Sequence, residues 1–260
     1  MKMLIDLHNH TALCRHASGT IEEYIQTAIT QKIDIFGFSD HAPMNFDTYR
    51  MRFDEMDIYE AKVLHVKEKY TGQIDILLGY EVDFLEGYID QSVLERKVDY
   101  LIGSVHYLGN WGFDNPEYIG EYKGKNIDDV WQTYFDAIEK LAKSRLFDIV
   151  GHLDLIKIFN YLPQKDVRLL AKDALNAIKD ANMVVEINAA GLRKPIGEQY
   201  PSSALIEMMA ELDIPISFGS DAHEIGHIGF KKEEIRAFAK SYGYKKCATF
   251  KNRERMLVNF

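Results

Sequence analysis

The stretch MLIDLHNH, residues 3–10, places two histidines directly after a short apolar run. The same arrangement recurs along the chain, with an apolar run, then polar residues, and often a helical pattern behind them. The seven runs are Met3–Leu7, Ile33–Phe38, Ile74–Val82, Tyr100–Val105, Phe147–Val150, Met183–Ile187 and Ile214–Phe218. Because the runs are continuous rather than alternating, they predict strands that are buried on both faces of a parallel sheet.

Patterns typical of helices follow several of these runs. Thr20 and Glu23 form a capping box at the start of one helix, because each side chain can satisfy the other residue's free amide. Further helices are expected at Asp57–Tyr70, Ile127–Lys143, Val167–Ala181 and Ser203–Leu212. Seven strand–helix units in 260 residues favour one closed or nearly closed α/β barrel, although an eight-stranded barrel of about 250 residues fits the length too. No linker or low-complexity stretch divides the chain, so we expect a single domain over residues 1–260.

Composition and charge exclude several classes of protein. The 40 acidic and 31 basic residues give a formal net charge of −9, which argues against nucleic acid or an anionic membrane surface as a partner. No apolar run approaches the roughly 18 residues of a membrane span, and the first residues lack the apolar core of a signal peptide. Two cysteines, Cys14 and Cys247, cannot build a disulfide framework. We therefore expect a cytoplasmic protein, and the sequence makes no prediction of its oligomeric state.

Most of the histidines lie at or just beyond the ends of the predicted strands. Seven of the nine lie there with one glutamate and one aspartate, the set being His8, His10, His16, His41, Glu81, His106, His152, Asp221 and His223. The carboxyl ends of parallel strands meet at one rim of a barrel, where active sites lie. His8 and His10 are two residues apart on a strand, so their side chains point the same way. The sequence therefore predicts that these nine side chains meet in one cup.

Such a cup of imidazoles points to bound metal. A single histidine at a strand end is usually a surface or hydrogen-bonded residue, but seven together would repel one another if charged and lose their hydration if neutral. A metal ion removes both costs. Nitrogen and carboxylate ligands favour zinc, manganese or iron over magnesium or calcium. Nine ligands are too many for one ion, so we expect two or three ions with a bridging carboxylate, and we interpret Cys14 as a spacer rather than a ligand.

These motifs resemble those of the PHP (polymerase and histidinol phosphatase) family of metal-dependent phosphoesterases. The matching motifs are Asp6-Leu-His8-Asn-His10-Thr11, His16, Ser39-Asp40-His41, Glu81, Ser104-Val-His106, Gly151-His152-Leu-Asp154 and Ser220-Asp221-Ala-His223. The resemblance implies the family's fold, a distorted seven-stranded (β/α)7 barrel similar to the TIM barrel. It also implies a trinuclear metal site. The first ion would be held by His8, His10, Glu81 and Asp221, the second by Glu81, His106 and His152, and the third by His16, His41 and His223.

Within that family the chain is similar to the stand-alone histidinol-phosphate phosphatases. Gly151-His152-Leu-Asp154 and Asn188-Ala-Ala-Gly191-Leu-Arg193 resemble their fifth- and sixth-strand motifs. The resemblance implies hydrolysis of L-histidinol phosphate to L-histidinol and phosphate in histidine biosynthesis, with a small phosphate ester as the substrate. Metal ions suit this reaction because they lower the pKa of water enough to supply hydroxide at neutral pH.

Two residues near the predicted cup are candidates for direct contact with the substrate. Arg193 follows the one run whose end carries no metal ligand, and a guanidinium matches phosphate oxygens bidentately, so we expect a phosphate clamp. The alternative is a surface arginine paired with a carboxylate. Asp154 lies two residues past His152 and is expected either to give a proton to the leaving alkoxide or to orient a ligand histidine. Asp40 is expected to support a ligand rather than to react.

Two segments are expected near the rim. Leu108–Lys125 is rich in aromatic and acidic residues and could close over a cationic alcohol that bears an imidazole, or it could be an ordinary packed excursion. Phe46–Phe53 is a second possible wall, whose arginines Arg50 and Arg52 receive no assigned role. The alternative activities are a phosphatase or exonuclease acting on nucleotides or DNA ends, a metallohydrolase of the amidohydrolase type, and a metal-binding scaffold without catalysis.

Overall fold

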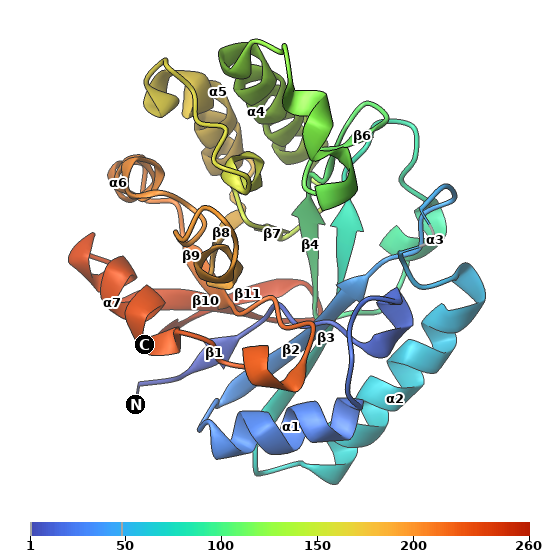
Figure 1. Ribbon diagram of the computed structural model, residues 1–260. Helices are drawn as coiled ribbons and strands as arrows, with labels where there is room; N and C mark the ends of the chain where they lie inside the picture. The colour runs from blue at the N-terminus through green and yellow to red at the C-terminus, as the bar shows by residue number, and fades with distance from the viewer. Residues whose placement is uncertain (1, 48) are drawn as a thin grey trace.

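Seven parallel strands form the centre of the protein, which we describe from a computed structural model covering residues 2–47 and 49–260. In order around the sheet they are β1 (Ile5–Asp6), β2 (Ile35–His41), β3 (Asp75–Asp83), β4 (Tyr100–Ser104), β7 (Ile149–Val150), β8 (Val184–Asn188) and β9 (Ile216–Gly219). β9 returns beside β1, where the Leu7 amide donates to the Phe218 carbonyl at 2.8 Å. The sheet is therefore a nearly closed barrel (Figure 1), and the predicted α/β barrel is confirmed with seven strands.

Helices lie around the outside of these strands (Figure 1). They are α1 (Ile21–Thr30), α2 (Met56–Lys69), α3 (Gln91–Leu94), α4 (Ile127–Ser144), α5 (Val167–Asp180), α6 (Ser203–Glu211) and α7 (Lys232–Ser241). The capping box of α1 is present as predicted, because the Glu23 amide donates to Thr20 Oγ1 and the Thr20 amide donates to the Glu23 carboxylate. The four other predicted helices match α2, α4, α5 and α6 to within one residue at each end.

Two hairpins were not predicted from the sequence. β5 (Tyr107–Leu108) and β6 (Trp111–Gly112) pair at the start of the segment that follows β4. β10 (Lys246–Lys251) and β11 (Glu254–Asn259) pair near the end of the chain. The turn between β10 and β11 is tied to the amino ends of β4 and β7, because Arg253 donates to the Asp99 carbonyl and pairs with Asp148. Short 3-10 helices occupy other loops, at Ala12–Cys14, Phe53–Glu55, Pro116–Tyr122, Leu155–Lys157, Ala190–Arg193 and Ile225–His227.

A tyrosine fills the interior of the barrel below the strand ends. The Tyr100 hydroxyl donates to the Leu7 carbonyl at 2.6 Å, and so ties β4 to the residue that follows β1. Its ring lies against Gly37 and Gly79, where a Cβ atom would come within 2.1 and 2.8 Å of Tyr100 respectively. Glycine at these two positions therefore leaves room for the ring. The ring thus helps to make the barrel interior a packed core rather than a channel.

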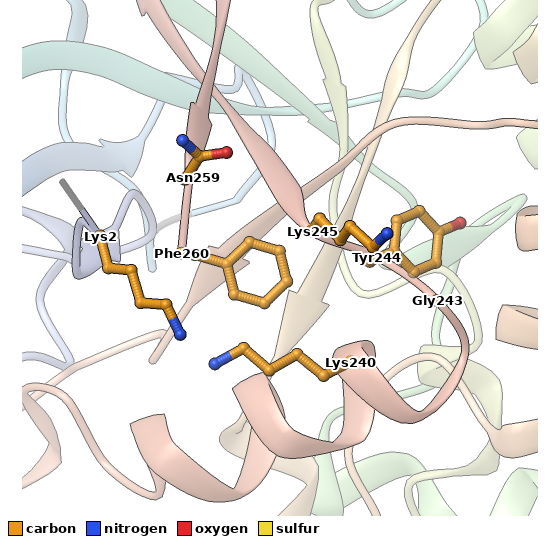
Figure 2. A pocket seen from close by; sticks show the side chains of 7 residues that line it. All are labelled: Lys2, Lys240, Gly243, Tyr244, Lys245, Asn259 and Phe260. Carbon is orange, nitrogen blue, oxygen red and sulfur yellow. The ribbon is translucent and has the colours of Figure 1, made fainter.

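One cavity lies at the amino-terminal end of the barrel, away from the histidines. It has a volume of about 530 Å³ and is lined by Lys2, Lys240, Gly243, Tyr244, Lys245, Asn259 and Phe260 (Figure 2). This lining contains no predicted metal ligand.

Among residues 2–47 and 49–260, no helix combines the length and apolarity that crossing a bilayer requires.

Candidate metal centre

The carboxyl ends of the strands place all nine predicted ligands at one rim. His8 and His10 follow β1, while His41 and Glu81 lie within β2 and β3 near their ends. The remaining predicted ligands lie in the loops after the strands, these being His16, His106, His152, Asp221 and His223. Seven of the nine line a cavity of about 740 Å³, and the other two, His8 and His10, are fully buried beside Glu81. The structure thus brings together the residues that the sequence singled out.

Glu81 lies at the centre of this group, and its two carboxylate oxygens face different histidines. Oε2 lies 3.3 Å from His8 Nε2 and 3.6 Å from His10 Nε2. Oε1 lies 3.0 Å from His152 Nε2 and 3.6 Å from His106 Nε2. Burial raises the pKa of Glu81, but the nearby histidines outweigh this effect and hold the pKa well below its usual range. His41 Nδ1 also lies 2.9 Å from Oε2. Glu81 is therefore an ionised carboxylate with imidazoles on both of its oxygens, which is the geometry that a bridging ligand needs.

Unpartnered nitrogens show that these residues fit a cation. His8 Nε2 and His10 Nε2 are buried and have no hydrogen-bond partner among the described residues. Buried polar atoms in native proteins are nearly always satisfied, so such nitrogens require a partner. Asp221 Oδ1 lies 3.2 Å from His10 Nε2 and 4.0 Å from His8 Nε2. Two imidazole nitrogens and two carboxylates thus converge on one point, which is a donor set suited to zinc, manganese or iron.

Two further groups of three residues match the other implied sites. Glu81, His106 and His152 offer ligand atoms within 4.8 Å of one another. His16, His41 and His223 do the same, and the Nε2 atoms of His16 and His223 are 3.1 Å apart. Burial and the neighbouring His10 keep the pKa of His223 well below its usual range, so this imidazole is neutral and able to act as a ligand.

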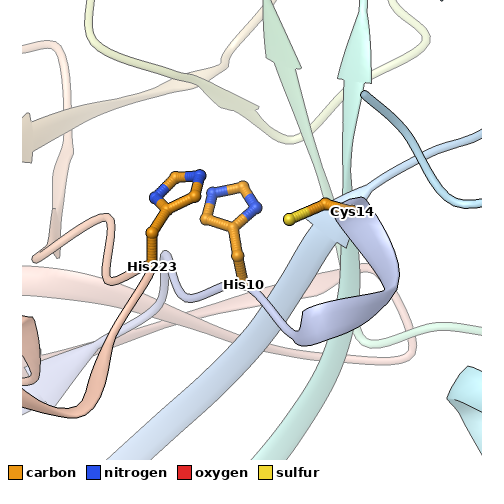
Figure 3. A group of neighbouring side chains, drawn as sticks. All are labelled: His10, Cys14 and His223. Atoms are coloured by element: carbon orange, nitrogen blue, oxygen red, sulfur yellow. The ribbon is translucent and has the colours of Figure 1, made fainter. Parts of the chain in front are cut away.

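Cys14 lies beside this third group, but its other contacts do not favour a role as a metal ligand. Figure 3 shows its sulfur near the ring of His10, which stacks on His223 at 4.0 Å between ring centroids. The thiol donates to the Thr11 carbonyl at 3.2 Å, and burial raises the pKa of Cys14. A thiol that stays protonated is a poor metal ligand. These contacts favour the predicted role of Cys14 as a spacer.

Carboxylates behind the ligands hold several imidazoles in place. Glu186 accepts a hydrogen bond from His8 Nδ1 at 2.8 Å, and Asp83 accepts one from His106 Nδ1. Asp40 lies 3.5 Å from His10 Nδ1, which has no hydrogen-bond partner among the described residues, so the supporting role expected for Asp40 stays a prediction. A carboxylate on one ring nitrogen fixes the tautomer and turns the other nitrogen toward the metal. The sequence analysis missed Glu186 and Asp83, although an acidic residue inside an apolar run is a usable indication for Glu186.

Arg193 lines the same cavity and keeps one donor free. Its Nη2 donates to the Ser220 and Asp221 carbonyls at 2.9 and 3.0 Å, and its guanidinium lies over the Phe230 ring. Its Nη1 is buried and unpartnered, and Arg193 makes no ion pair with any described residue. This arrangement fits the predicted phosphate clamp and not the alternative of a surface ion pair.

Asp154 does not line the cavity. Its carboxylate is fully buried, accepts a hydrogen bond from the Ser202 amide at 2.9 Å and pairs with the buried Lys157 at 3.0 Å. Lys157 also donates to Glu198 at 2.6 Å and lies under the ring of Tyr200. These contacts favour a role in supporting the cavity wall around Tyr200. Both predicted roles of Asp154, as a proton donor and as a residue that orients a ligand histidine, stay predictions.

Both segments expected near the rim contribute to the cavity walls. Asn110, Gly112 and Asp114–Tyr118 come from the segment after β4, and Phe46, Asp47, Tyr49 and Arg50 come from the loop after β2. Asp114 and Glu117 both line the cavity, and neither forms an ion pair with any residue in 2–47 or 49–260. Glu121 of the same segment does not line it.

The barrel and its rim define a hydrolase that depends on divalent metal ions, and comparison with known proteins gives its family. The profile described as "PHP domain" matches residues 6–190. A Deinococcus radiodurans protein named "Probable histidinol-phosphatase" is 40% identical over 89% of this chain and 90% of its own length. The chain therefore belongs to the PHP family, as the resemblance implied.

Further relatives agree in fold and length. The histidinol-phosphatase of Bacillus subtilis is 28% identical, and the match covers 88% of this chain and 96% of that protein. A crystal structure of histidinol phosphate phosphatase from Lactococcus lactis, complexed with zinc, L-histidinol and phosphate, superposes with a TM-score of 0.82. It is 20% identical and the match covers 98% of this chain and 100% of that one, which supports the shared fold.

Proposed function

We propose that the protein is a histidinol-phosphatase, which hydrolyses L-histidinol phosphate to L-histidinol and phosphate. The observation that carries this proposal is the content of one cavity, where a cage of imidazoles and carboxylates, a free arginine donor and two unpaired carboxylates lie together. The names of the relatives from Deinococcus radiodurans and Bacillus subtilis support the same substrate. A role in histidine biosynthesis follows from that reaction.

The proposed metal centre contains three ions, of zinc, manganese or iron, held by the three ligand groups described above. When bound, such ions lower the pKa of water and neutralise phosphate charge. The protein's own residues then position the substrate. Arg193 offers Nη1 to a phosphate oxygen while the Ser220 and Asp221 carbonyls hold Nη2 in place, so the guanidinium is oriented before the substrate arrives.

The acidic wall favours a cationic leaving group. Asp114, Glu117 and Tyr118 line the cavity, and the aromatic residues Phe46 and Tyr49 line it from the loop after β2. Unpaired carboxylates attract an ammonium or imidazolium group, and aromatic faces add a cation–π contribution. The nucleoside part of a nucleoside monophosphate is uncharged at neutral pH, so it gains no such attraction from these carboxylates. The wall therefore supports an amino alcohol phosphate over a nucleoside monophosphate.

The direct test is phosphate release from histidinol phosphate and from nucleoside monophosphates, compared by kcat/KM after loading the metal-free protein with manganese, zinc or iron. We expect kcat/KM for histidinol phosphate to exceed that for any nucleotide by at least a hundredfold. Equal or faster turnover of nucleotides would remove the proposed substrate while leaving a phosphatase. No phosphate release with any of the metals would remove the proposal altogether.

We further propose that residues 1–260 form one domain, because the buried apolar side chains form a single cluster from Ile5 to Phe260. Cys14 and Cys247 are both unpaired and buried, which supports a reducing compartment such as the cytoplasm.

A further inference from the structure

Two arginines line the cavity, and their donors are used in opposite ways. Arg193 keeps a free Nη1, whereas each of the three guanidinium nitrogens of Arg50 donates a hydrogen bond to the protein. Arg50 Nε and Nη2 donate to the two oxygens of Asp83 at 2.7 and 3.3 Å, and Nη1 donates to the Tyr49 carbonyl at 3.0 Å. Nη1 also lies 3.4 Å from Asp47. Its side chain is only 7% exposed, and all three guanidinium nitrogens of Arg50 already contact described residues of the protein.

The carboxylate that Arg50 holds is the one that orients a metal ligand. Asp83 uses Oδ1 to accept a hydrogen bond from His106 Nδ1, which leaves Nε2 of His106 facing Glu81 Oε1 at 3.6 Å. A bidentate guanidinium contact allows the carboxylate only one orientation. Without it, Asp83 could rotate about its side-chain bonds, and the imidazole of His106 would lose its fixed direction.

Through Nη1, Arg50 also contacts Asp47 in the wall of the cavity. Asp47 accepts a hydrogen bond from the hydroxyl of Tyr107, and both residues line the cavity. Asp47 lies in the loop after β2, while Tyr107 directly follows His106 and begins β5, in the segment after β4. Since β3 separates β2 from β4 in the sheet, Arg50 joins loops from both sides across the end of β3, where Asp83 is the last residue.

We propose that Arg50 is a positioning residue, which fixes His106 through Asp83 and fixes the cavity wall through Asp47. This inference rests on the proposed ligand role of His106. It predicts that Arg50 controls the affinity for one ion of the centre, the ion held by Glu81, His106 and His152. It also predicts a rise in KM, because the wall formed by Asp47 and Tyr107 loosens in the same variant.

The test compares Arg50→Gln with Arg52→Gln, whose arginine lies two residues away, is 65% exposed and pairs only with Asp54 and Glu55. Metal affinity is measured by competition with a coloured chelator, and His106→Gln identifies the ion concerned. We expect Arg50→Gln to lower the affinity for that same ion ten- to a hundredfold, which is the range for loss of a residue that orients a ligand. Arg52→Gln should stay within twofold of the natural protein.

A double-variant cycle tests whether Arg50 acts through Asp83. If it does, the double variant Arg50→Gln with Asp83→Asn should have an affinity for the ion at most threefold below that of the weaker-binding single variant. Affinity losses that multiply would overturn the proposed route, and an unchanged metal affinity in Arg50→Gln would overturn the role itself. A natural protein that binds no metal would overturn both the metal centre and this inference, and so is distinguishable from failure of Arg50 alone.

Arg50→Lys provides the test if Arg50→Gln does not fold. Lysine keeps the positive charge beside Asp83 but cannot span both carboxylate oxygens while also reaching Asp47. We expect a thermal midpoint close to that of the natural protein, metal affinity at the same ion at least threefold lower, and a raised KM. Natural metal affinity and KM in a folded Arg50→Lys would show that charge alone suffices, and would overturn a positioning role.

Discussion

At the scale of single residues, the chemistry of the centre depends on which imidazoles carry a proton. His106 lies between two carboxylates, Asp83 and Glu81. Burial lowers the pKa of His106, but the charges of Asp83 and Glu81 outweigh burial and raise the pKa to about 9. His106 is therefore protonated at neutral pH in the metal-free protein, whereas a metal ligand must be neutral.

Metal uptake should consequently release a proton at pH 7.5. The sign for stability follows from the same shift. The charged His106–Asp83 pair stabilises the metal-free fold fully below pH 6.5, the ordinary pKa of histidine, and this contribution is lost as the pH rises through about 9. Calorimetric titration in buffers of different ionisation enthalpy measures the proton release, and urea unfolding at pH 6.5 and 9 measures the stability. Metal binding with no proton released would contradict this assignment of charge.

Arg193 gives a second prediction at this scale. Arg193→Ala removes the free Nη1 donor and should lower kcat/KM by about a hundred- to a thousandfold, the usual cost of losing one preorganised donor to a developing charge. Arg168→Ala is the matched control, since this arginine is half exposed on α5 and pairs with Glu207. Unchanged steady-state kinetics in Arg193→Ala would remove the phosphate clamp.

A variant of Asp154 distinguishes a role in supporting the cavity wall from a role in donating a proton. Asp154→Asn leaves the buried Lys157 with Glu198 as its remaining charged partner, so we expect a loss of about 1–3 kcal/mol in the free energy of unfolding. The pH profile of kcat/KM should keep its shape. If instead one limb of the profile disappears while urea unfolding is unchanged, Asp154 is the proton donor.

The sequence predicted the nine ligand candidates but not the supporting roles of Glu186, Asp83 and Arg50, for a physical reason. Ligand types at strand ends are recognisable because parallel strands all end at one rim. Glu186 meets His8 only because residues 178 positions apart are brought together by packing, and nothing local to Glu186 names its partner. Arg50 is similar, because its bond to Asp83 depends on the path of the loop after β2.

At the scale of elements, the close approach of neighbouring strands limits which residues are allowed. β9 passes Glu186 of β8 at Gly219, where a Cβ atom would lie 1.9 Å from the Glu186 carboxylate and 2.6 Å from His8 Cβ. Glycine is required there so that the carboxylate can reach His8. The seven barrel strands and the helices α1, α2, α4, α5 and α6 were predicted, since continuous apolar runs and a capping box have local causes, whereas α3 and α7 were not. The β10–β11 hairpin was not, because its anchors, Asp99 and Asp148, lie far away in sequence.

Gly219→Ala should therefore displace Glu186 from His8. We expect a loss of about 1–3 kcal/mol in the free energy of unfolding from overpacking, and metal affinity lowered about ten- to a hundredfold at the ion held by His8. Gly120→Ala is the control, because no heavy atom lies within 4 Å of the added Cβ. Urea unfolding and chelator competition measure the two effects. Equal behaviour of the two variants would contradict the tight approach of β8 and β9.

At the scale of the whole molecule, the two ends of the barrel differ in what they do. The amino-terminal end is covered by the β10–β11 hairpin, while the carboxyl end carries unpartnered buried nitrogens and ionised carboxylates. These groups are desolvated without full compensation, so the metal-free fold should be less stable than the loaded one.

Removal of metal should lower the thermal midpoint. An ion present at about 100 times its dissociation constant adds about 2.7 kcal/mol, which corresponds to about 5–11 °C for a chain of this size. Scanning calorimetry with a chelator, and again after metal is restored, measures the shift. A thermal midpoint that is the same with and without metal would indicate that the polar groups at the rim are already compensated in the metal-free protein.

The most direct measurement of the central claim is anomalous diffraction from crystals loaded with zinc or manganese. The account predicts an ion within about 2.0–2.2 Å of His8 and His10 nitrogens and another beside His106 and His152, with one oxygen of Glu81 on each. Ions bound elsewhere, or a Glu81 carboxylate that touches neither ion, would contradict it.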